Sequence, residues 1–365
     1  MAKDLDANFA AVFKAIDDLN PEASFLDEST LSNVDSWIDT GSMALNAIVS
    51  GSLYKGIPSG RIIGLSGPSA CGKTLIINKI LANAQKAGRM PVVWDTEVAI
   101  DKETAAACGC DVSKMKYCPV ETVESCRNQV VAFLESVIEK KLQGKFIIAI
   151  DSIGNLVSAK ELNDAIAGKE AADMGTRAKA LKSMLRVLTY KTAKADTPII
   201  FTNHIYANPT ELYPSLVKQQ SGGSGPIYMS SVLVQLASKT EKQDEKRSGD
   251  VILPNANKVS GVTLRALTVK NRFAPPFLET ELYLNFRTGL NKYSGLLEMA
   301  VGYGVIVQNG ATYALADGTK LGYYKNWCDD DQLWESRILP SLEENLKKTV
   351  MYSQSYAEEV KIKEE

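Results

Sequence analysis

Between residue 60 and about residue 236, short runs of apolar and β-branched residues alternate with longer stretches whose apolar residues recur at helical spacing. Such alternation is typical of an α/β domain whose sheet is mostly parallel and carries helices on both faces. Functional residues of these sheets gather at the carboxyl ends of the strands. The expected strands are Arg61–Ser66, Met90–Asp95, Phe146–Asp151, Pro198–Thr202 and Ser231–Leu236, and the expected helices are 74–87, 121–142 and 176–195.

The pattern changes at both ends of the chain. Residues 4–19 place apolar side chains on one side of a helix, which Asn20-Pro21 ends. That face, and the apolar patch around Phe25, need a partner, which is either the protein's own core or a neighbouring subunit. Short helices and Gly/Tyr-rich turns beyond about residue 291 indicate a small C-terminal α+β domain. The expected domains are an N-terminal oligomerisation helix and linker at 1–30, a core at 31–290, and a C-terminal domain and tail at 291–365.

Two segments of the core lack a clear period. Residues 203–230 are rich in proline and glycine, and a loop of this length in a compact domain is usually functional or disordered. Residues 238–260 are highly charged, and we expect a solvated excursion between two strands.

Composition narrows the possible functions. A formal net charge of −2 at pH 7 means that any nucleic-acid binding must come from a local basic patch. The six cysteines show no metal-ligand spacing, so reduced thiols are expected. No apolar run approaches the roughly 20 residues of a membrane span. The first residues carry no signal-peptide pattern, which predicts a cytoplasmic protein with no membrane partner.

The most specific motif follows the first expected strand. Two glycines spaced by four residues and followed by Lys-Thr form the phosphate-loop pattern, in which backbone N–H groups at a helix start point at an anion. Lys73 would reach the β- and γ-phosphates of ATP, and the Thr74 hydroxyl would ligate Mg²⁺. A glycine turn without a ligand is disfavoured, because strand, loop and helix stand in the required order. The expected nucleotide-binding residues are Gly67, Pro68, Ser69, Ala70, Cys71, Gly72, Lys73 and Thr74.

Three further strand ends supply chemistry at the same edge. Asp151 ends an apolar strand, the position from which a carboxylate holds Mg²⁺ through water. Glu97 follows the strand that ends at Asp95, and we interpret it as the general base for the attacking water; the alternative is a solvated or helix-capping carboxylate. His204, the sole histidine, follows the fourth expected strand. It is either a surface or core residue of no special role, or a sensor of the γ-phosphate that couples ATP to the long loop.

Taken together, these motifs resemble the RecA family of homologous-recombination ATPases, and within it the phage recombinases. The resemblance covers about residues 24 to 345. The segments that carry it are GPSACGKT at 67–74, DTE at 95–97, IDSIGNLVSAKE at 150–161, DMGTRAKALKSMLR at 173–186, SGGSGPIYMSS at 221–231 and VKNRFAPPF at 269–277. ATPase signatures alone would match many families, whereas the last three of these segments narrow the choice to recombinases.

The segment 173–186 is the expected first DNA-binding loop and helix. Its cations Lys179, Lys182 and Arg186 are spaced i, i+3, i+7 and share one helix side, which by itself is also compatible with a merely solvated face. The resemblance implies that Lys179 and Arg186 contact phosphates and that Met174 inserts between base triplets. Such a combination of contacts binds DNA without sequence preference. The expected DNA-binding residues are Met174, Gly175, Arg177, Lys179, Lys182 and Arg186 here, and Gly222 and Gly223 in a second, mobile DNA-binding loop at 205–226.

The resemblance also implies a site shared between subunits. Lys270 and Arg272 resemble two cations that reach the ATP bound on the adjacent protomer, where they would stabilise the transferring phosphoryl group in trans. The alternative from the residues alone is two solvated charges on an edge strand. Tyr228 matches an aromatic position that packs across subunits in the family, and residues 4–19 and Phe25 would dock on the neighbouring protomer.

Three departures from the family are visible. His204 stands where most members have Gln, a change that phage-type members share. Thr104 stands where relatives often place a Tyr that stacks on adenine, so base recognition is looser or rests on Asp101 and Phe286. The C-terminal tail is less acidic than in relatives, which weakens any case for regulation by an acidic tail.

The sequence therefore predicts a recombinase and DNA-dependent ATPase. It would form an ATP-dependent helical filament on single-stranded DNA, pair it with double-stranded DNA and exchange strands in recombination, repair and recombination-dependent replication. Its other expected partners are a single-stranded DNA-binding protein and a mediator, and a phage-encoded protein would work in the host cell cytoplasm. The alternatives are a ring-forming helicase or motor ATPase on the same core, and a DNA-binding recombinase paralogue with a regulatory role.

Overall fold

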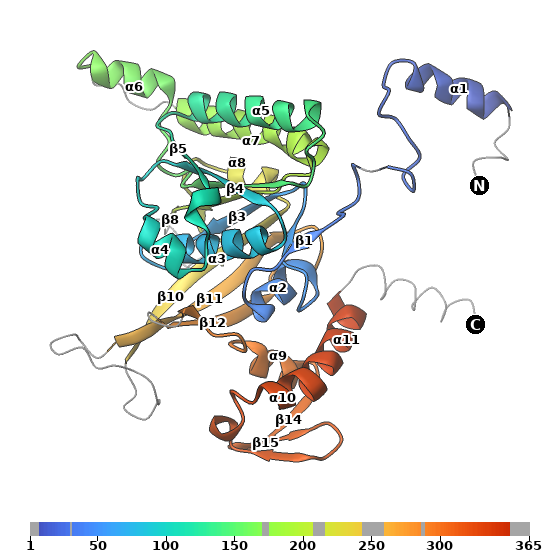
Figure 1. Ribbon diagram of the computed structural model, residues 1–365, viewed down its shortest axis with the longest axis vertical. Coiled ribbons are helices and arrows are strands. Elements are labelled where there is room, and N and C mark those ends of the chain that lie inside the picture. Colours follow the sequence, from blue (N-terminus) through green and yellow to red (C-terminus); the bar gives the residue numbers. More distant parts are fainter. Residues whose placement is uncertain are drawn as a thin grey trace. The chain divides into compact units, whose positions relative to one another are not determined.

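The computed structural model describes residues 7–29, 31–169, 175–206, 216–242, 259–285 and 289–350 (Figure 1). The chain divides into two compact units, Met1–Ser36 and Trp37–Glu365. In the first unit, the expected helix is present as α1 (Ala7–Asp17). It leaves Phe9, Val12 and Ile16 exposed, while the rings of Phe13 and Phe25 meet edge to face with centroids 5.6 Å apart.

A nine-stranded sheet organises the second unit, in the order β13-β12-β11-β10-β3-β7-β6-β4-β5. The six strands from β10 to β5 are parallel, and β11, β12 and β13 extend the sheet with antiparallel pairs. The mostly parallel α/β fold is thus confirmed. The strands are β3 (Ile62–Ser66), β4 (Met90–Asp95), β5 (Lys116–Pro119), β6 (Phe146–Asp151), β7 (Ile199–Asn203), β10 (Val232–Lys242), β11 (Val259–Asn271), β12 (Glu279–Asn285) and β13 (Gly289–Leu290).

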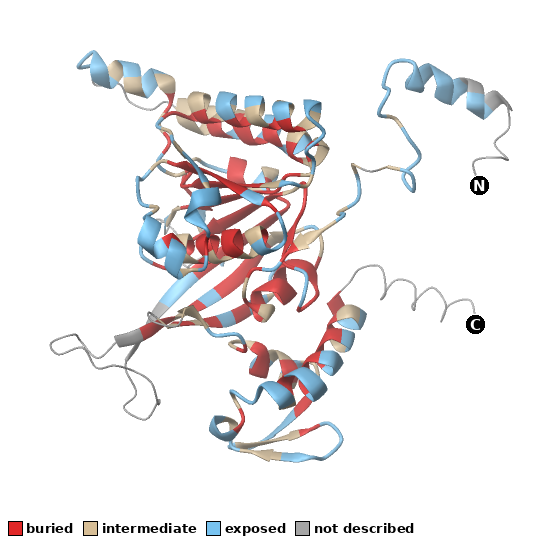
Figure 2. Cartoon of the chain, viewed as in Figure 1, coloured by how far each residue is buried: buried red, intermediate tan, exposed pale blue. Residues whose placement is uncertain are grey.

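Helices cover both faces of this sheet, and each face has its own apolar core (Figure 1). On one face lie α2 (Met43–Ser50) and α3 (Lys73–Lys86), and on the other α5 (Val123–Glu139) and α7 (Thr176–Lys194). Hydrophobic residues of α5 and α7 recur at spacings of three and four, which gives each helix one buried stripe. Figure 2 shows these stripes as red inner faces beneath exposed outer faces.

Several smaller elements join the main ones. The short strands form two-stranded pairs, β1 with β2 and β8 with β9. The helix α6 buries none of its residues and begins with a capping box between Ser158 and Glu161. The bounds are β1 (Trp37–Ile38), β2 (Ile57–Pro58), α4 (Lys102–Ala107), α6 (Ala159–Ile166), β8 (Ile205–Tyr206), β9 (Gln219–Gln220) and α8 (Gly225–Met229).

The C-terminal part has the expected α+β character. Its three-stranded antiparallel sheet is built from β14 (Ile306–Asn309), β15 (Thr312–Leu315) and β16 (Lys320–Gly322). The rings of Tyr293 and Trp334 stack with centroids 4.9 Å apart in its core. The helices are α9 (Leu296–Gly302), α10 (Asp331–Leu333) and α11 (Leu339–Val350), with a π-helical turn at Trp334–Ile338.

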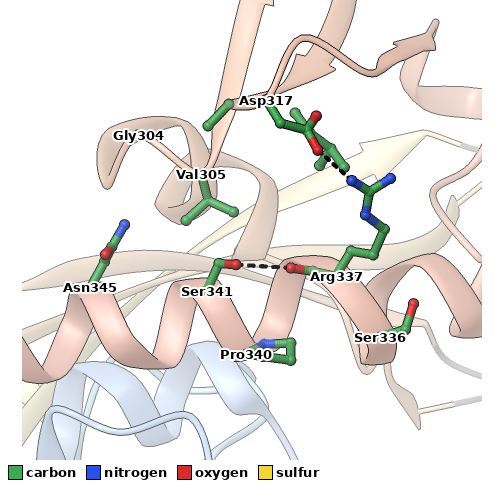
Figure 3. A pocket seen from close by; sticks show the side chains of 10 residues that line it. Gly304, Val305, Asp317, Ser336, Arg337, Pro340, Ser341 and Asn345 are labelled. Atoms are coloured by element: carbon green, nitrogen blue, oxygen red, sulfur yellow. Dashed lines mark hydrogen bonds and ion pairs between the residues drawn. The ribbon is translucent and has the colours of Figure 1, made fainter.

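A pocket of about 380 Å³ lies in this C-terminal part, between the turn after α9 and the start of α11 (Figure 3). Arg337 and Asp317 form an ion pair at its wall, and Pro340 lines it beside Ser341. None of the residues expected at the nucleotide or DNA sites lines this pocket. Among the described residues, no helix is both long and apolar enough to cross a bilayer.

One buried carboxylate joins the C-terminal part to the core. Glu343 of α11 accepts hydrogen bonds from the Ser52 hydroxyl at 2.6 Å and from the Leu53 backbone N–H at 2.7 Å. Lys347, one turn further along α11, lies 3.0 Å from the same carboxylate. Because the side chain of Glu343 is 10 % exposed, water cannot readily replace these contacts.

We predict that Glu343→Ala lowers the free energy of unfolding by about 2–3 kcal/mol, because it leaves two donors without their acceptor. Urea denaturation followed by tryptophan fluorescence measures the change. Glu344→Ala is the matched control: this neighbour pairs with Lys348 on the surface of α11, and its loss should cost about 0.5 kcal/mol or less. Equal effects of the two substitutions would contradict the anchoring role of Glu343.

Candidate active site

The phosphate-loop segment connects the end of β3 to the start of α3, as expected. Two of its residues adopt left-handed backbone, Ala70 with φ 58° and Gly72 with φ 83°. At Gly67 a Cβ atom would lie 2.7 Å from the Cys71 sulfur, so only glycine fits there. The Lys73 ammonium donates to the carbonyl oxygens of Gly67 at 3.1 Å and Pro68 at 2.7 Å. The loop therefore holds a cation above backbone N–H groups at a helix start, which is the arrangement that binds phosphate.

Cys71 fills the space beneath this loop. Its side chain is fully buried, and its sulfur lies 3.9 Å from the Lys73 ammonium. Burial raises the pKa of the Cys71 thiol, and the nearby Lys73 charge offsets only part of that rise. A buried thiol with a raised pKa is a packing group rather than a reactive one. The contact with Gly67 accounts for a small side chain at this position.

Asp151 lies between two hydroxyl groups at the end of β6. Thr74 donates to one carboxylate oxygen at 2.7 Å, and Thr202, at the end of the neighbouring strand β7, donates to the other. Burial raises the pKa of the Asp151 carboxyl, the two hydroxyl hydrogen bonds lower it, and the charges of Glu97 and Asp95 raise it further. A buried carboxylate beside other carboxylates is stabilised by a bound cation.

This donor set fits Mg²⁺. Hydroxyl and carboxylate oxygens are the ligands that Mg²⁺ prefers, and the ion usually keeps waters and phosphate oxygens as its remaining ligands. Within the described part of the chain, no cluster of three or more His, Cys, Asp or Glu side chains could hold a metal by protein ligands alone. Thr74 and Asp151 are therefore the residues that would hold the ion, together with oxygen atoms of the nucleotide phosphates.

Glu97 is held at one carboxylate oxygen by two side chains. The Ser152 hydroxyl donates to Glu97 Oε1 at 2.7 Å, and His204 Nε2 lies 3.2 Å from the same oxygen. The backbone N–H groups of Glu97 and Ile100 donate to the fully buried Asp95 carboxylate at 2.9 and 3.1 Å, which fixes the turn that carries Glu97. Neither side-chain contact uses Oε2, which leaves that oxygen to accept a proton from water.

His204 connects Glu97 to the long loop. Its backbone carbonyl accepts from the N–H of Ser221 at 2.9 Å, and the amide of Asn203 donates to the Ser221 carbonyl at 3.0 Å. These bonds place the segment after β9 beside the strand end that carries His204. The histidine contacts the candidate base directly, and its role as a sensor of the γ-phosphate stays a prediction.

Lys270 and Arg272 lie where the parallel strands begin, at the opposite side of the sheet from Thr74, Asp151 and Glu97, which lie where those strands end. β11 runs antiparallel to β10, and Asn271 pairs with Val232, whose parallel partner is Ile63 near the start of β3. Arg272 follows the end of β11, so it stands where β3 begins, whereas the phosphate loop follows the end of β3. β11 lies between β10 and β12, but its pairing with β12 ends at Leu267, before Lys270, so the alternative of two solvated charges stays open. Within one chain, the two cations and Glu97 are therefore kept apart.

The Lys270 ammonium is partly buried and donates to the carbonyl oxygen of Tyr228 at 2.6 Å. Burial lowers the pKa of Lys270, and the neighbouring Arg272 charge lowers it further. Tyr228 itself is 62 % exposed, so its ring remains available at this edge.

The expected DNA-binding residues of α7 fall into two groups. Lys179, Lys182 and Arg186 are exposed on the outer side of the helix, opposite the buried stripe that includes Leu181 and Leu185. Arg177 departs from this row: its guanidinium donates to the Gly154 carbonyl and, at 2.7 Å, to the Ser221 hydroxyl. Gly175, with φ 76°, is the N-cap of α7, and Met174 lies outside the described residues.

The glycines after β9 have a packing role that the sequence did not indicate. Both are left-handed, with φ 79° at Gly222 and 78° at Gly223. At Gly222 a Cβ atom would lie 2.4 Å from Leu181 Cδ1, so a side chain there would have to displace the Leu181 side chain of α7. Their contribution to phosphate contacts stays a prediction.

The expected adenine contacts receive less support. The Asp101 carboxylate caps α4 by accepting from the Thr104 backbone N–H at 2.9 Å and from its hydroxyl at 3.2 Å. Both hydrogen bonds lower the pKa of Asp101, and the bond from the Thr104 backbone N–H has the larger effect. Its local role is therefore helix capping, and Thr104 completes the cap. Phe286 lies outside the described residues.

We predict that Asp151→Asn raises the melting temperature of the nucleotide-free protein at neutral pH. Because the folded-state pKa of Asp151 is raised, its ionised form costs stability, and that cost grows as the pH rises through the folded pKa. The difference from the unsubstituted protein should therefore shrink on acidification. Thermal melting over a pH series measures it, and a gap that is constant with pH would contradict the assignment. The same variant should lose stabilisation by Mg²⁺ with ATP.

Comparison with known proteins agrees with this geometry. The family model of the RecA N-terminal domain matches residues 12–291. The protein RecA of Desulforapulum autotrophicum is 30 % identical over 292 residues, which cover 78 % of this chain and 75 % of the relative. The protein RecA of Thermus thermophilus is 31 % identical over 287 residues, covering 77 % and 76 %. The protein RecA of Borrelia duttonii is 26 % identical over 318 residues, covering 87 % and 81 %.

Proposed function

The chain belongs to the RecA family, and we propose that it is a recombinase with DNA-dependent ATPase activity. It assembles with ATP into a helical filament on single-stranded DNA, pairs that strand with homologous duplex DNA and exchanges strands. The observation that carries this proposal is that Lys270 and Arg272 lie where the parallel strands begin, whereas Glu97 lies where they end. Two such half-sites meet only when one copy stacks on the next, which is a head-to-tail interface.

In the proposed reaction, Lys73 and the loop N–H groups bind the phosphates, and Glu97 Oε2 accepts the proton of the attacking water. Ser152 and His204 hold the other oxygen of Glu97 and so orient it. Thr74 and Asp151 would hold Mg²⁺, which would supply charge neutralisation at the bound phosphates. Lys270 and Arg272 of the adjacent copy stabilise the negative charge of the transition state.

DNA binding is assigned to the outer side of α7. Lys179, Lys182 and Arg186 form an exposed basic row, which suits contact with a phosphate backbone of any sequence. A search for homologous DNA requires binding that does not depend on the DNA sequence. Hydrolysis at the nucleotide site would loosen the filament rather than drive pairing.

The remaining parts of the proposal concern the biological system in which the protein acts and its partner proteins. We assign the protein to a phage-type recombination, repair and recombination-dependent replication system, acting in the cytoplasm of a host cell. A single-stranded DNA-binding protein and a mediator are the further partners expected of a filament that must displace competitors from DNA.

Strand exchange between circular single-stranded and linear duplex DNA tests the function. We predict joint molecules with the unsubstituted protein and none with Lys73→Ala, because the phosphate cation is lost. Lys179→Ala should weaken DNA binding and reduce its salt slope by about one. Robust ATP hydrolysis without joint molecules would sink the recombinase assignment; duplex unwinding by closed rings would indicate a helicase, and DNA binding without hydrolysis a regulatory paralogue.

A mixing experiment tests the shared site. Glu97→Gln and Arg272→Ala should each abolish hydrolysis alone, since each removes one half of every site. Mixed in equal amounts on single-stranded DNA, they should recover roughly a quarter of the unsubstituted activity, because one interface in four then pairs an intact Glu97 with an intact Arg272. The matched control mixes Glu97→Gln with Lys73→Ala, which damage the same half and should recover nothing. No recovery in the first mixture would mean that the two cations do not act in trans.

A further inference from the structure

The guanidinium of Arg177 joins three segments that lie far apart in the sequence. Arg177 is in the first turn of α7, which carries the basic row. One of its nitrogens, Nη2, donates both to the carbonyl oxygen of Gly154, in the turn that follows β6, and to the hydroxyl of Ser221, which follows β9. The Ser221 hydroxyl itself lies 3.4 Å from the Gly154 carbonyl, so the three groups form a closed set.

This set is continuous with the candidate catalytic base. Ser221 donates its N–H to the His204 carbonyl at 2.9 Å, and His204 Nε2 lies 3.2 Å from Glu97 Oε1. The packing is tight on the other side as well. A Cβ atom at Gly154 would lie 3.0 Å from both Asn203 Oδ1 and His204 Cδ2, so the turn packs closely against the strand end that carries His204.

Ser221 and Gly222 also fix this junction to the helix. Ser221 is 5 % exposed, and the Leu181 side chain occupies the space where a Gly222 side chain would be. A displacement of His204 therefore changes the position of Ser221, and a displacement of Ser221 changes the hydrogen bond to Arg177 and the contact with Leu181. Both of those residues belong to the first two turns of α7.

We propose that Arg177 is a positioning residue that couples the nucleotide state at Glu97 and His204 to the orientation of α7, and that it does not itself contact DNA. Its side chain is engaged by Gly154 and Ser221, whereas the cations of the basic row are exposed on the outer side of the same helix. The coupling is reciprocal, because DNA that orients α7 biases Glu97 by the same free energy with which the nucleotide biases α7. The inference rests on the proposed function, since it assigns the path by which DNA stimulates hydrolysis.

The test compares Arg177→Ala with Arg177→Lys and with Lys179→Ala in the full chain. Two quantities are measured: the ratio of DNA-stimulated to basal ATP hydrolysis at saturating single-stranded DNA, and the salt slope of DNA affinity with a non-hydrolysable ATP analogue. Arg177→Ala should lower the ratio about tenfold, a typical size for coupling between sites, and leave the salt slope unchanged. Arg177→Lys, which keeps a donor and the charge, should restore part of the ratio.

Lys179→Ala should give the reverse result, a salt slope reduced by about one and a ratio that survives at saturating DNA. If Arg177→Ala behaves in the same way as Lys179→Ala, Arg177 is a DNA contact and the coupling is overturned. If the unsubstituted protein hydrolyses ATP without any response to DNA, the proposed function fails and the coupling fails with it. The two failures are therefore distinguishable.

Ser221→Ala keeps the test decisive if Arg177→Ala does not fold. It removes one acceptor of the guanidinium and should lower the stimulation ratio by less than Arg177→Ala does. When both variants fold, the double substitution should be no worse than Arg177→Ala alone, because the two residues act through one contact. Independent, multiplicative losses would contradict a shared path.

Discussion

The buried carboxylate of Asp151 is the constraint on which the rest of the site depends. The register of β4 and β6 pairs Asp95 with Asp151, so two carboxylates lie side by side at one sheet edge with almost no access to water. Asp95 is satisfied by two backbone N–H groups and by the Tyr117 hydroxyl at 3.2 Å, and it shapes the turn that carries Glu97. Asp151 accepts hydrogen bonds from two hydroxyl groups among the described residues, and its pKa is raised. In the proposed function a cation would complete this edge, with Glu97 beside it.

Much of this arrangement could be predicted from local sequence. The strands at Met90–Asp95 and Phe146–Asp151 were predicted with their observed bounds, because each is an apolar run that ends abruptly at an aspartate. The strand at Ile199–Asn203 lies one residue later than expected, and the helix at Thr176–Lys194 ends one residue earlier. Parallel strands bring their ends to one edge, so the convergence of Thr74, Glu97 and Asp151 followed from strand order alone.

What escaped prediction depends on contacts between distant segments. Arg177 was predicted to bind DNA together with Lys179, Lys182 and Arg186. Residues two apart on a helix differ by about 200° in direction, so the spacing already set Arg177 apart from the row; its partners at Gly154 and Ser221 could not be read from the sequence. The packing of Cys71 on Gly67, and of Gly222 on Leu181, likewise appears only when the segments are in place.

Two levels of coupling meet at the nucleotide site in the proposed filament. Within one copy, Arg177 and His204 connect the base to the DNA-binding helix. Between copies, Lys270 and Arg272 stand at the far edge of the sheet, so each copy completes the site of its neighbour while its own site stays open to the next. Because both connections meet at the nucleotide site in this proposal, loss of the γ-phosphate would weaken the interface and the orientation of α7 at once. We propose that a filament built in this way would release its neighbour and its DNA together, so that hydrolysis would serve disassembly rather than pairing.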